Sequence, residues 1–448
     1  MATSPHHWQN WAGNQRARPR KTASPASAEE VAAAVKDAGR DGLTVRMAGT
    51  GHSFTPAAVT DGLLLRPDGL RAVRSVDARA GLVTVEAGCP LRNLNETLLR
   101  HGLSLANMGD IQEQTVAGAI QTGTHGTGRT VGAIAAQVAG LEVVLADGSV
   151  RTCSAERDPD LFRAALVGLG ALGVATAVTF HVVPAFLLEA REAPMRWDEV
   201  LGRLDELTAD NEHFEFYWFP HTEGCLTKRN NPVGGAARPL PRFRRWRDDE
   251  FLANSVFGLT CRLGHAFPGV IKTVNGIAGK AIGARTYVQP AHQVFTSPRR
   301  VRFIEQEYAI ARAHLPHALT EIRGLFATRT WRVSFPIEVR VTPADDLWLS
   351  TAHGRDSAYI ALHVYHKSDH REYFREVEAV MTALGGRPHW GKLHTRDASY
   401  LAKVYPRFRD FVTMRNKLDP QRRFGNGYLT RVLGPLPSTS AVGGNDDT

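Results

Sequence analysis

Two glycine-rich loops in the first third of the chain place the strongest limit on its fold. The first, at residues 49–53, directly follows a predicted strand at residues 43–48, and the second spans residues 115–128. Glycine permits a positive φ and lets a ligand approach the backbone closely, and threonine adds hydroxyl donors. Because successive backbone amides in such turns bind phosphate oxygens, the two loops predict a dinucleotide held within one mixed α/β unit.

A third glycine run, at residues 168–173, matches the G-x-G-x-x-G pattern of nicotinamide-binding Rossmann folds. That pattern needs a strand before it and a helix after it, so that the helix N-terminus meets the pyrophosphate. Here residues 160–165 are predicted to be helical and residues 174–180 to form a strand. A helix-to-strand turn near the nucleotide is therefore favoured over a Rossmann site.

Two local signals mark further elements of this unit. Ser27 and Glu30 form a capping box, which predicts a helix that ends near Gly39. Asp147 and Gly148 stand between two apolar runs, a pattern typical of a β-hairpin.

From about residue 183 the chain changes to longer alternating strands rich in aromatic residues, at 213–219, 335–341 and 359–365. A period of two buries one face of a sheet and leaves the other free for a site. We therefore predict an α+β chain whose second domain is a large antiparallel sheet flanked by helices. Residues 437–448 are rich in Ser, Gly, Asn and Asp and are expected to form a disordered tail.

Composition excludes several classes of protein. The 448 residues are 43% hydrophobic and 22% charged, which is typical of a globular chain long enough for two domains. No run of about 18 uncharged apolar residues occurs, and residues 1–25 lack the apolar core of a signal peptide. We therefore expect no transmembrane segment and a cytoplasmic location. The four cysteines lie far apart without metal-ligand spacing, so we predict neither a disulfide framework nor a metal site.

The charge of the chain favours an anionic ligand, with a net value of +9. A basic run interleaved with aromatic residues lies at 238–247, and acidic residues follow directly at 248–250. A solvated loop is the favoured interpretation, and an acidic surface or partner stays open. A non-catalytic binding module would bind nucleic acid in a salt-sensitive manner and carry no cofactor. We expect no nucleic-acid partner.

Charged residues of the second domain lie where a site is expected. Glu338 and Arg340 are two positions apart on an alternating strand, so both project from the same face, and His363 lies on the polar face of another strand. On sequence alone, an exposed ion pair explains Glu338 and Arg340 as well as a functional site does. Residues 389–392, His-Trp-Gly-Lys, have the rigid aromatic character of a substrate wall.

Six motifs in order along the chain resemble the aldonolactone oxidase group of the vanillyl-alcohol oxidase flavoprotein superfamily, which includes gulonolactone, arabinonolactone and alditol oxidases. They are the sequences Ala-Gly-Thr-Gly-His-Ser at 48–53, Asn-Met-Gly-Asp at 107–110, Thr-Gly-Thr-His-Gly-Thr-Gly at 122–128, Leu-Gly-Ala-Leu-Gly-Val at 169–174, Glu-Val-Arg at 338–340 and Arg-Pro-His-Trp-Gly-Lys at 387–392. The resemblance runs from about Trp11 to about Gly434.

The resemblance implies a two-domain FAD-linked oxidase, with a PCMH-type FAD-binding domain at residues 1–182 and a cap domain at 183–395. Residues 396–436 would return to the FAD side. The His of the first loop is joined covalently to the flavin in this group, which implies covalent FAD at His52. The implied cofactor-binding residues are Met47, Ala48, Gly49, Thr50, Gly51, His52, Ser53, Gly109, Asp110, Thr115, Gly118, Thr122, Gly123, Thr124, His125 and Val174.

The implied reaction is oxidation of a secondary alcohol carbon in a sugar lactone. Hydride would pass to flavin N5 and O2 would be reduced to hydrogen peroxide, with Gly109 compatible with access of oxygen. The implied catalytic residues are Glu338, Arg340, Lys392, Glu305 and His363. Arg340 and Lys392 would stabilise alkoxide character while Glu338 holds the hydroxyl.

Three alternatives stay open at this point. Glu305 stands where lactone oxidases carry Glu and alditol oxidases carry Gln, which favours a lactone over an alditol such as xylitol or sorbitol. A dehydrogenase that passes electrons to an acceptor other than O2 is the second alternative, and an NADPH-dependent reductase, which the cap residues match poorly, is the third. The sequence departs from the group at Asp110, where many relatives have Ser, and at Ala311-Arg312, where Pro is common.

Overall fold

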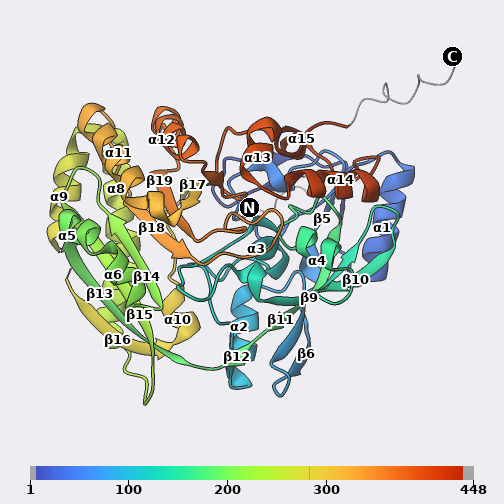
Figure 1. Cartoon of the computed structure of the whole chain (residues 1–448), viewed down its shortest axis with the longest axis horizontal. Coiled ribbons are helices and arrows are strands. Elements are labelled where there is room, and N and C mark those ends of the chain that lie inside the picture. Colours follow the sequence, from blue (N-terminus) through green and yellow to red (C-terminus); the bar gives the residue numbers. More distant parts are fainter. Residues whose placement is uncertain (1–6, 282, 437–448) are drawn as a thin grey trace.

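The computed structural model describes residues 7–281 and 283–436, so the tail predicted at residues 437–448 lies outside the described residues. Figure 1 shows two halves side by side, one built around a large sheet and the other containing the smaller sheets. Helices and antiparallel sheets are thus combined in one α+β chain, as predicted. Among the described residues, no helix combines the length and apolar character needed to cross a membrane.

Two smaller sheets form the half that carries both glycine-rich loops. A parallel sheet has the order β3-β5-β4, and an antiparallel sheet has the order β10-β9-β11-β7-β6. Their strands are β3 (Lys21–Ala23), β4 (Val45–Met47), β5 (Leu63–Leu65), β6 (Val73–Asp77), β7 (Leu82–Glu86), β9 (Val138–Val144), β10 (Val150–Ser154) and β11 (Val174–His181). Two ribbons add β1 (Trp8–Gln9) with β2 (Arg16–Ala17) and β8 (Leu103–Ser104) with β12 (Val183–Pro184).

The helices of this half confirm the local predictions. They are α1 (Ala28–Arg40), α2 (Leu91–Arg100), α3 (Val116–Thr122) and α4 (Pro159–Leu166), with short 3₁₀ turns η1 (Pro56–Ala58), η2 (Pro67–Gly69) and η3 (Ile134–Gln137). The Ser27 hydroxyl accepts a hydrogen bond from the Glu30 amide at 3.2 Å, as the capping box requires. The predicted hairpin is β9 paired with β10.

The third glycine run forms the predicted helix-to-strand turn. It connects α4 to β11, and Leu169 and Gly170 take positive φ angles of 58° and 63° within it. A strand-to-helix Rossmann turn is thus ruled out at this position.

An eight-stranded antiparallel sheet dominates the other half, with the order β16-β13-β15-β14-β18-β19-β17-β20. Its strands are β13 (Leu187–Arg196), β14 (His213–Trp218), β15 (Gly224–Val233), β16 (Arg285–Pro290), β17 (Phe303–Ala311), β18 (Ile337–Thr342), β19 (Ser357–Tyr365) and β20 (Arg387–Pro388). Its helices are α5 (Trp197–Gly202), α6 (Leu204–Ala209), α7 (Arg242–Arg245), α8 (Phe257–Ala266), α9 (Ile271–Ala281), α10 (Ala291–Phe295), α11 (Leu315–Thr328) and α12 (Arg371–Ala383), with the π-helix η4 (Trp246–Val256) and the 3₁₀ turns η5 (Pro268–Val270) and η6 (Arg312–His314).

The two faces of this sheet differ in character. Apolar residues such as Val339 and Ile360 face a core completed by α5, α6, α11 and α12. The alternate positions, among them Glu338 and Arg340, are polar and also buried, which implies that a second body covers this face. Contacts such as the hydrogen bond from the Thr127 hydroxyl to the Phe214 carbonyl, at 2.5 Å, come from the half with the glycine-rich loops.

The last described helices pack against the half that holds the glycine-rich loops. They are α13 (Ala398–Val404), α14 (Phe408–Leu418) and α15 (Gly427–Leu433), and Leu401, Phe411 and Leu429 join its main core. The Val45 amide also donates to the Arg423 carbonyl at 2.7 Å, which ties the C-terminal segment to β4. The exact domain bounds given above stay a prediction.

Candidate active site

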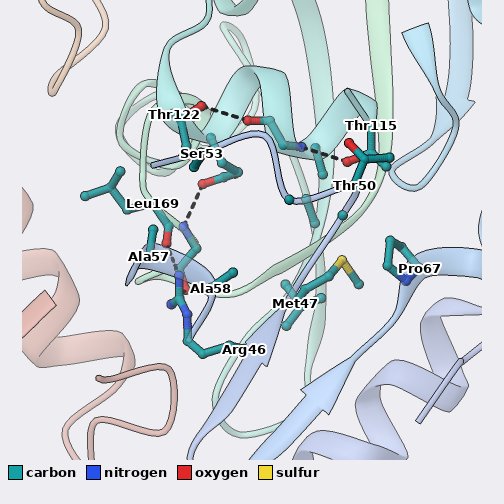
Figure 2. A pocket seen from close by; sticks show the side chains of 18 of the residues that line it. Arg46, Met47, Thr50, Ser53, Ala57, Ala58, Pro67, Thr115, Thr122 and Leu169 are labelled. Carbon is teal, nitrogen blue, oxygen red and sulfur yellow. Dashed lines mark hydrogen bonds between the residues drawn. The ribbon is translucent and has the colours of Figure 1, made fainter. Parts of the chain in front are cut away.

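A groove lies where the two glycine-rich loops meet α3 and the helix-to-strand turn. It holds about 950 Å³ of empty volume, part of it open to solvent. Ten of the predicted cofactor-binding residues line it, namely Met47, Gly49, Thr50, Gly51, His52, Ser53, Thr115, Gly118, Thr122 and Val174. Figure 2 shows how side chains from these separate segments surround the groove.

The residues of the groove fit a dinucleotide. A Cβ added to Gly49 would lie 2.3 Å from Thr115 Oγ1, so only glycine lets the two loops approach this closely. Gly51 has a φ of 75°, a conformation that favours glycine. The side-chain oxygen of Gln114, which also lines the groove, is buried and lacks a hydrogen-bond partner among the described residues. Such an orphan acceptor is expected where a ligand supplies the missing donor.

Sequence reasoning missed part of the lining. Arg46 is the clearest case: its guanidinium donates to the Leu169 carbonyl at 2.6 Å, the Phe424 carbonyl at 2.8 Å and the Gly170 carbonyl at 3.0 Å, and Figure 2 shows it beside Leu169. Burial lowers the pKa of Arg46 to about 10. The other lining residues outside the predicted set are Trp8, Val45, Thr55, Ala57, Ala58, Pro67, Gln114, Ala117, Gln121, Leu169, Gly170, Gly173, Ala175 and Phe424. Of these, Leu169, Gly170 and Gly173 belong to the helix-to-strand turn that was expected near the nucleotide.

Six predicted cofactor-binding residues lie outside the lining of this groove. Ala48 packs in a small core with Trp8 and Leu64, and Gly123 ends α3 with a φ of 74°. Thr124 accepts a hydrogen bond from the Gln114 amide at 3.1 Å. Of the remaining three, Asp110 and His125 contact Arg340 and Glu307 of the other half, and Gly109 lies next to His125.

His125 forms a buried link between the halves. Its Nδ1 lies 2.9 Å from the Gly126 carbonyl, its Nε2 lies 3.2 Å from Glu307 of β17, and its ring stacks on Tyr359 at 3.7 Å. Although burial raises the pKa of Glu307, His125 outweighs it and holds that pKa below its usual range. His389 completes a trio whose ligand atoms lie within 4.8 Å, and its Nδ1 accepts the Gly391 amide at 3.0 Å.

Arg340 is the centre of a charged cluster on the polar face of the large sheet. Its guanidinium pairs with Asp110, with Glu338 and, at 2.9 Å, with Glu215. The Tyr217 hydroxyl donates to Glu338 at 2.6 Å. Two more cations surround the cluster: Lys228 lies 3.2 Å from Glu215, and Arg299 lies 2.5 Å from Asp110.

The carboxyl groups around Arg340 have different proton affinities. Burial raises the pKa of Glu338 to about 8, with Arg340 opposing the shift and Asp110 adding to it. Burial also acts on Asp110, but the charges of Arg340 and Arg299 outweigh it and hold the pKa of that carboxyl below its usual range. Glu338 is therefore the carboxyl of this cluster whose pKa is raised, whereas the pKa values of Asp110 and Glu215 are lowered.

The other predicted catalytic residues lie on neighbouring strands. Lys392 pairs with Glu305, and His363 lies 3.5 Å from Glu305 and 3.9 Å from Glu338. Burial lowers the pKa of His363. All five predicted catalytic residues are thus brought together, while their catalytic roles stay predictions. Sequence reasoning missed Glu215, Tyr217, Lys228 and Arg299.

Direct hydrogen bonds join the segment that precedes Lys392 to the His52 end of the groove. The Phe54 amide donates to the Gly391 carbonyl at 2.7 Å, and the Thr55 hydroxyl donates to the Trp390 carbonyl at 3.0 Å. The ammonium of Lys392 lies 5.3 Å from the centre of the Phe54 ring. The His52 ring stacks on Trp11 at 5.5 Å, and burial lowers its pKa, which favours the neutral imidazole.

Comparison with known proteins defines the class of enzyme. Residues 19–154 match the FAD binding domain family, and residues 178–432 match the D-arabinono-1,4-lactone oxidase family. A cholesterol oxidase from B. sterolicum superposes with a TM-score of 0.81 over 96% of this chain and 97% of that one, at 19% identity, which shows the same fold. The fold is of the PCMH type, and the chain is an FAD-dependent oxidoreductase.

Full-length relatives give the family. An L-gulono-1,4-lactone dehydrogenase of Mycobacterium tuberculosis is 40% identical over 96% of this chain and 99% of its own. An L-gulonolactone oxidase of Bos taurus is 34% identical, over 95% and 98%, and an alditol oxidase of Streptomyces sp. is 33% identical, over 95% and 98%. The chain belongs to the D-arabinono-1,4-lactone oxidase family, which confirms the resemblance drawn from its motifs.

Proposed function

We propose that the enzyme oxidises a secondary alcohol carbon of an aldono-1,4-lactone, L-gulono- or D-arabinono-1,4-lactone, and reduces O2 to hydrogen peroxide. One observation carries the proposal: the hydrogen bonds between residues 54–55 and 390–391, which bring Lys392 and Glu305 to the His52 end of the groove. A small polar substrate bound there would meet cofactor and charged side chains together.

When bound, FAD supplies the two-electron acceptor for this oxidation. Arg340 and Lys392 present positive charge to the hydroxyl oxygen as its proton leaves. Glu338 in its carboxylate form accepts the hydrogen bond from that hydroxyl, and its raised pKa makes that carboxylate a stronger base for the proton. Glu305 orients Lys392 through their ion pair.

The substrate class is tested with a panel of aldonolactones and alditols. We expect turnover of lactones by the wild-type enzyme and a lower lactone-to-alditol ratio of kcat/KM in Glu305→Gln. An alditol oxidase is the second candidate, supported by the relative with that name. Turnover of xylitol or sorbitol without turnover of any lactone would replace the proposal.

The acceptor is tested separately. The relative named a dehydrogenase supports a lactone dehydrogenase as an alternative. We expect peroxide in stoichiometric yield under air. Dye reduction under argon combined with no oxygen uptake under air would show that the enzyme is a dehydrogenase.

We also propose that His52 holds FAD covalently. A neutral imidazole nitrogen is a nucleophile, and the lowered pKa of His52 keeps the ring in that form. After acid precipitation, the flavin absorbance is expected in the wild-type pellet and in the supernatant for His52→Ala. His101→Ala, an exposed histidine at the end of α2, serves as the control. Wild-type flavin in the supernatant would rule out the bond.

A further inference from the structure

The segment 242–281, which contains α7, η4, α8, η5 and α9, has an unusually apolar surface, and we refer to it as the helical arm. Among the described residues, it contributes ten of the thirteen large hydrophobic side chains that are exposed. Phe243 is 71% exposed, Phe267 is 64% exposed and Trp246 is 53% exposed. Figure 1 shows α8 and α9 at the outer edge of the molecule, opposite the edge formed by α1. Apolar exposure of this extent marks a contact surface.

The exposed apolar side chains follow helical spacing. Val256, Leu259 and Leu263 are separated by three and four residues, so they share one side of α8 and its N-cap, and Leu252 precedes them in the π-helix. The other side packs inward, where Phe257 contacts Phe335 with ring centres 4.8 Å apart. The exposed apolar stripe therefore lies on the side of the helix that does not pack against the core.

The charges around this stripe are predominantly positive. The three acidic residues of the arm are engaged with arginines: Asp248 with Arg247 at 2.8 Å, Asp249 with Arg285 at 2.7 Å, and Glu250 with Arg300 at 3.0 Å. The exposed basic residues of the arm include Arg242, Arg245, Arg262 and Lys272. Basic side chains beside exposed Trp, Phe and Leu are typical of helices that bind membrane surfaces.

A basic hollow lies beside α8 and is lined in part by the arm. Arg262 of the arm lines it together with Arg302, His366 and Arg300, the last of which also pairs with Glu250. Such a hollow is complementary to a phosphate group at the depth of lipid headgroups. A second copy of the chain would instead bring two basic surfaces together, which electrostatic repulsion opposes.

We propose that the helical arm binds to the surface of an anionic lipid bilayer. The leucine stripe and the aromatic side chains enter the interfacial region, and the arginines contact lipid phosphates. Because the apolar stripe runs along the axis of the helical stretch with basic residues beside it, the arm lies parallel to the surface. This inference is independent of the substrate and acceptor proposed above.

The test uses the purified full-length holoenzyme and sedimentation with vesicles. Vesicles of phosphatidylcholine containing one third phosphatidylglycerol are compared with vesicles of phosphatidylcholine alone. We expect binding to the anionic vesicles, weaker binding at high salt, and a blue shift of tryptophan fluorescence that is reduced in Trp246→Phe.

Two double variants separate the apolar and charged contributions. Leu259→Ser with Leu263→Ser and Arg242→Glu with Arg245→Glu are each expected to weaken binding by at least about tenfold. The control is Leu99→Ser with Val150→Ser, whose side chains are 39% and 41% exposed outside the arm. Oxidation of soluble substrate is expected to be unchanged in all three, which verifies folding.

Three results would overturn the proposal. They are wild-type protein that does not sediment with anionic vesicles, a leucine variant that binds as tightly as the wild type, and concentration-dependent dimerisation through the arm without vesicle binding. The last result would identify a second copy of the chain as the partner of the arm.

Discussion

The cofactor groove and the charged cluster lie side by side, but the groove is formed mainly by backbone and the cluster by side chains. The groove depends on backbone that approaches closely, as between Gly49 and Thr115, and its signals are contiguous in sequence. The cluster depends on side chains brought together by strand register, since Arg340 lies opposite Glu215 and Glu305 lies opposite His363. A slip of one residue would turn these side chains to the apolar face, so the large sheet must be formed before the cluster exists.

The largest expected effect comes from removing the central cation of the cluster. Arg340→Met leaves Asp110, Glu215 and Glu338 without their shared partner in a buried site. Loss of one partner from a buried ion pair costs about 3–5 kcal/mol. We expect a decrease of that size in the free energy of unfolding, together with loss of turnover, measured by denaturant titration and steady-state kinetics.

Arg203→Met is the matched control for this variant. Arg203 pairs with Glu199 at 3.2 Å and Glu206 at 2.6 Å, but these side chains are exposed. Exposed ion pairs contribute little, so stability is expected to change little. Equal losses in the two variants would show that the cluster has no special structural role.

Two buried glutamates of the large sheet are expected to affect stability with opposite pH dependence. Glu338 has its pKa raised from 4.5 to about 8, so the folded state binds its proton more tightly and stability falls as pH rises between those values. The pKa of Glu307 is lowered from 4.5, so its contribution is present above that pH and is lost as pH falls below it.

The isosteric variants Glu338→Gln and Glu307→Gln test this contrast. Glu338→Gln is expected to flatten the pH dependence of unfolding between about 4.5 and 8, and Glu307→Gln to flatten it below 4.5. The free energy of unfolding is measured across both ranges. Identical profiles for the two variants would contradict the assigned proton affinities.

A smaller effect is expected when the groove is crowded. Gly49→Ala forces a Cβ against Thr115, and overpacking of this kind costs about 1–3 kcal/mol. We expect a lower flavin content in Gly49→Ala. Adding Thr115→Ala is expected to restore part of the flavin content, because it removes Thr115 Oγ1 and Cγ2, which the new Cβ would meet. Gly202→Ala, where the new Cβ meets no atom within 4 Å, is the control. Failure of the second substitution to restore flavin would show that the clash is not the cause.

The sequence predicted parts of both the groove and the cluster. Glycine runs and alternating strands are local patterns, and they identified the first loop, the face shared by Glu338 and Arg340, and the helix-to-strand turn. Arg46 and Phe424 were missed because they meet across 378 residues of chain, and neither residue carries a motif.

The sequence missed some members of the cluster for the same reason. Glu215 and Tyr217 lie on a strand that was predicted, but only the register of β14 against β18 places them beside Arg340 and Glu338. Arg299 lies in no regular element, and its contact with Asp110 depends on the packing of the two halves. Asp110 itself stood out as a departure from its relatives, and the cluster supplies the physical reason, because it pairs with two arginines.

The smallest expected effect is at Gly109, which directly precedes Asp110 of the cluster. A Cβ there would lie 3.1 Å from both the His125 carbonyl oxygen and Thr124 Cγ2, a tight contact that requires only a small shift of these neighbours. If oxygen enters here, Gly109→Ala lowers peroxide production several-fold while dye reduction under argon changes little, because only the route for O2 is narrowed. An oxygen electrode and a stopped-flow dye assay on one preparation measure both. Unchanged oxygen consumption would eliminate Gly109 as the gate, and equal losses in both assays would assign the residue to the packing of the two halves.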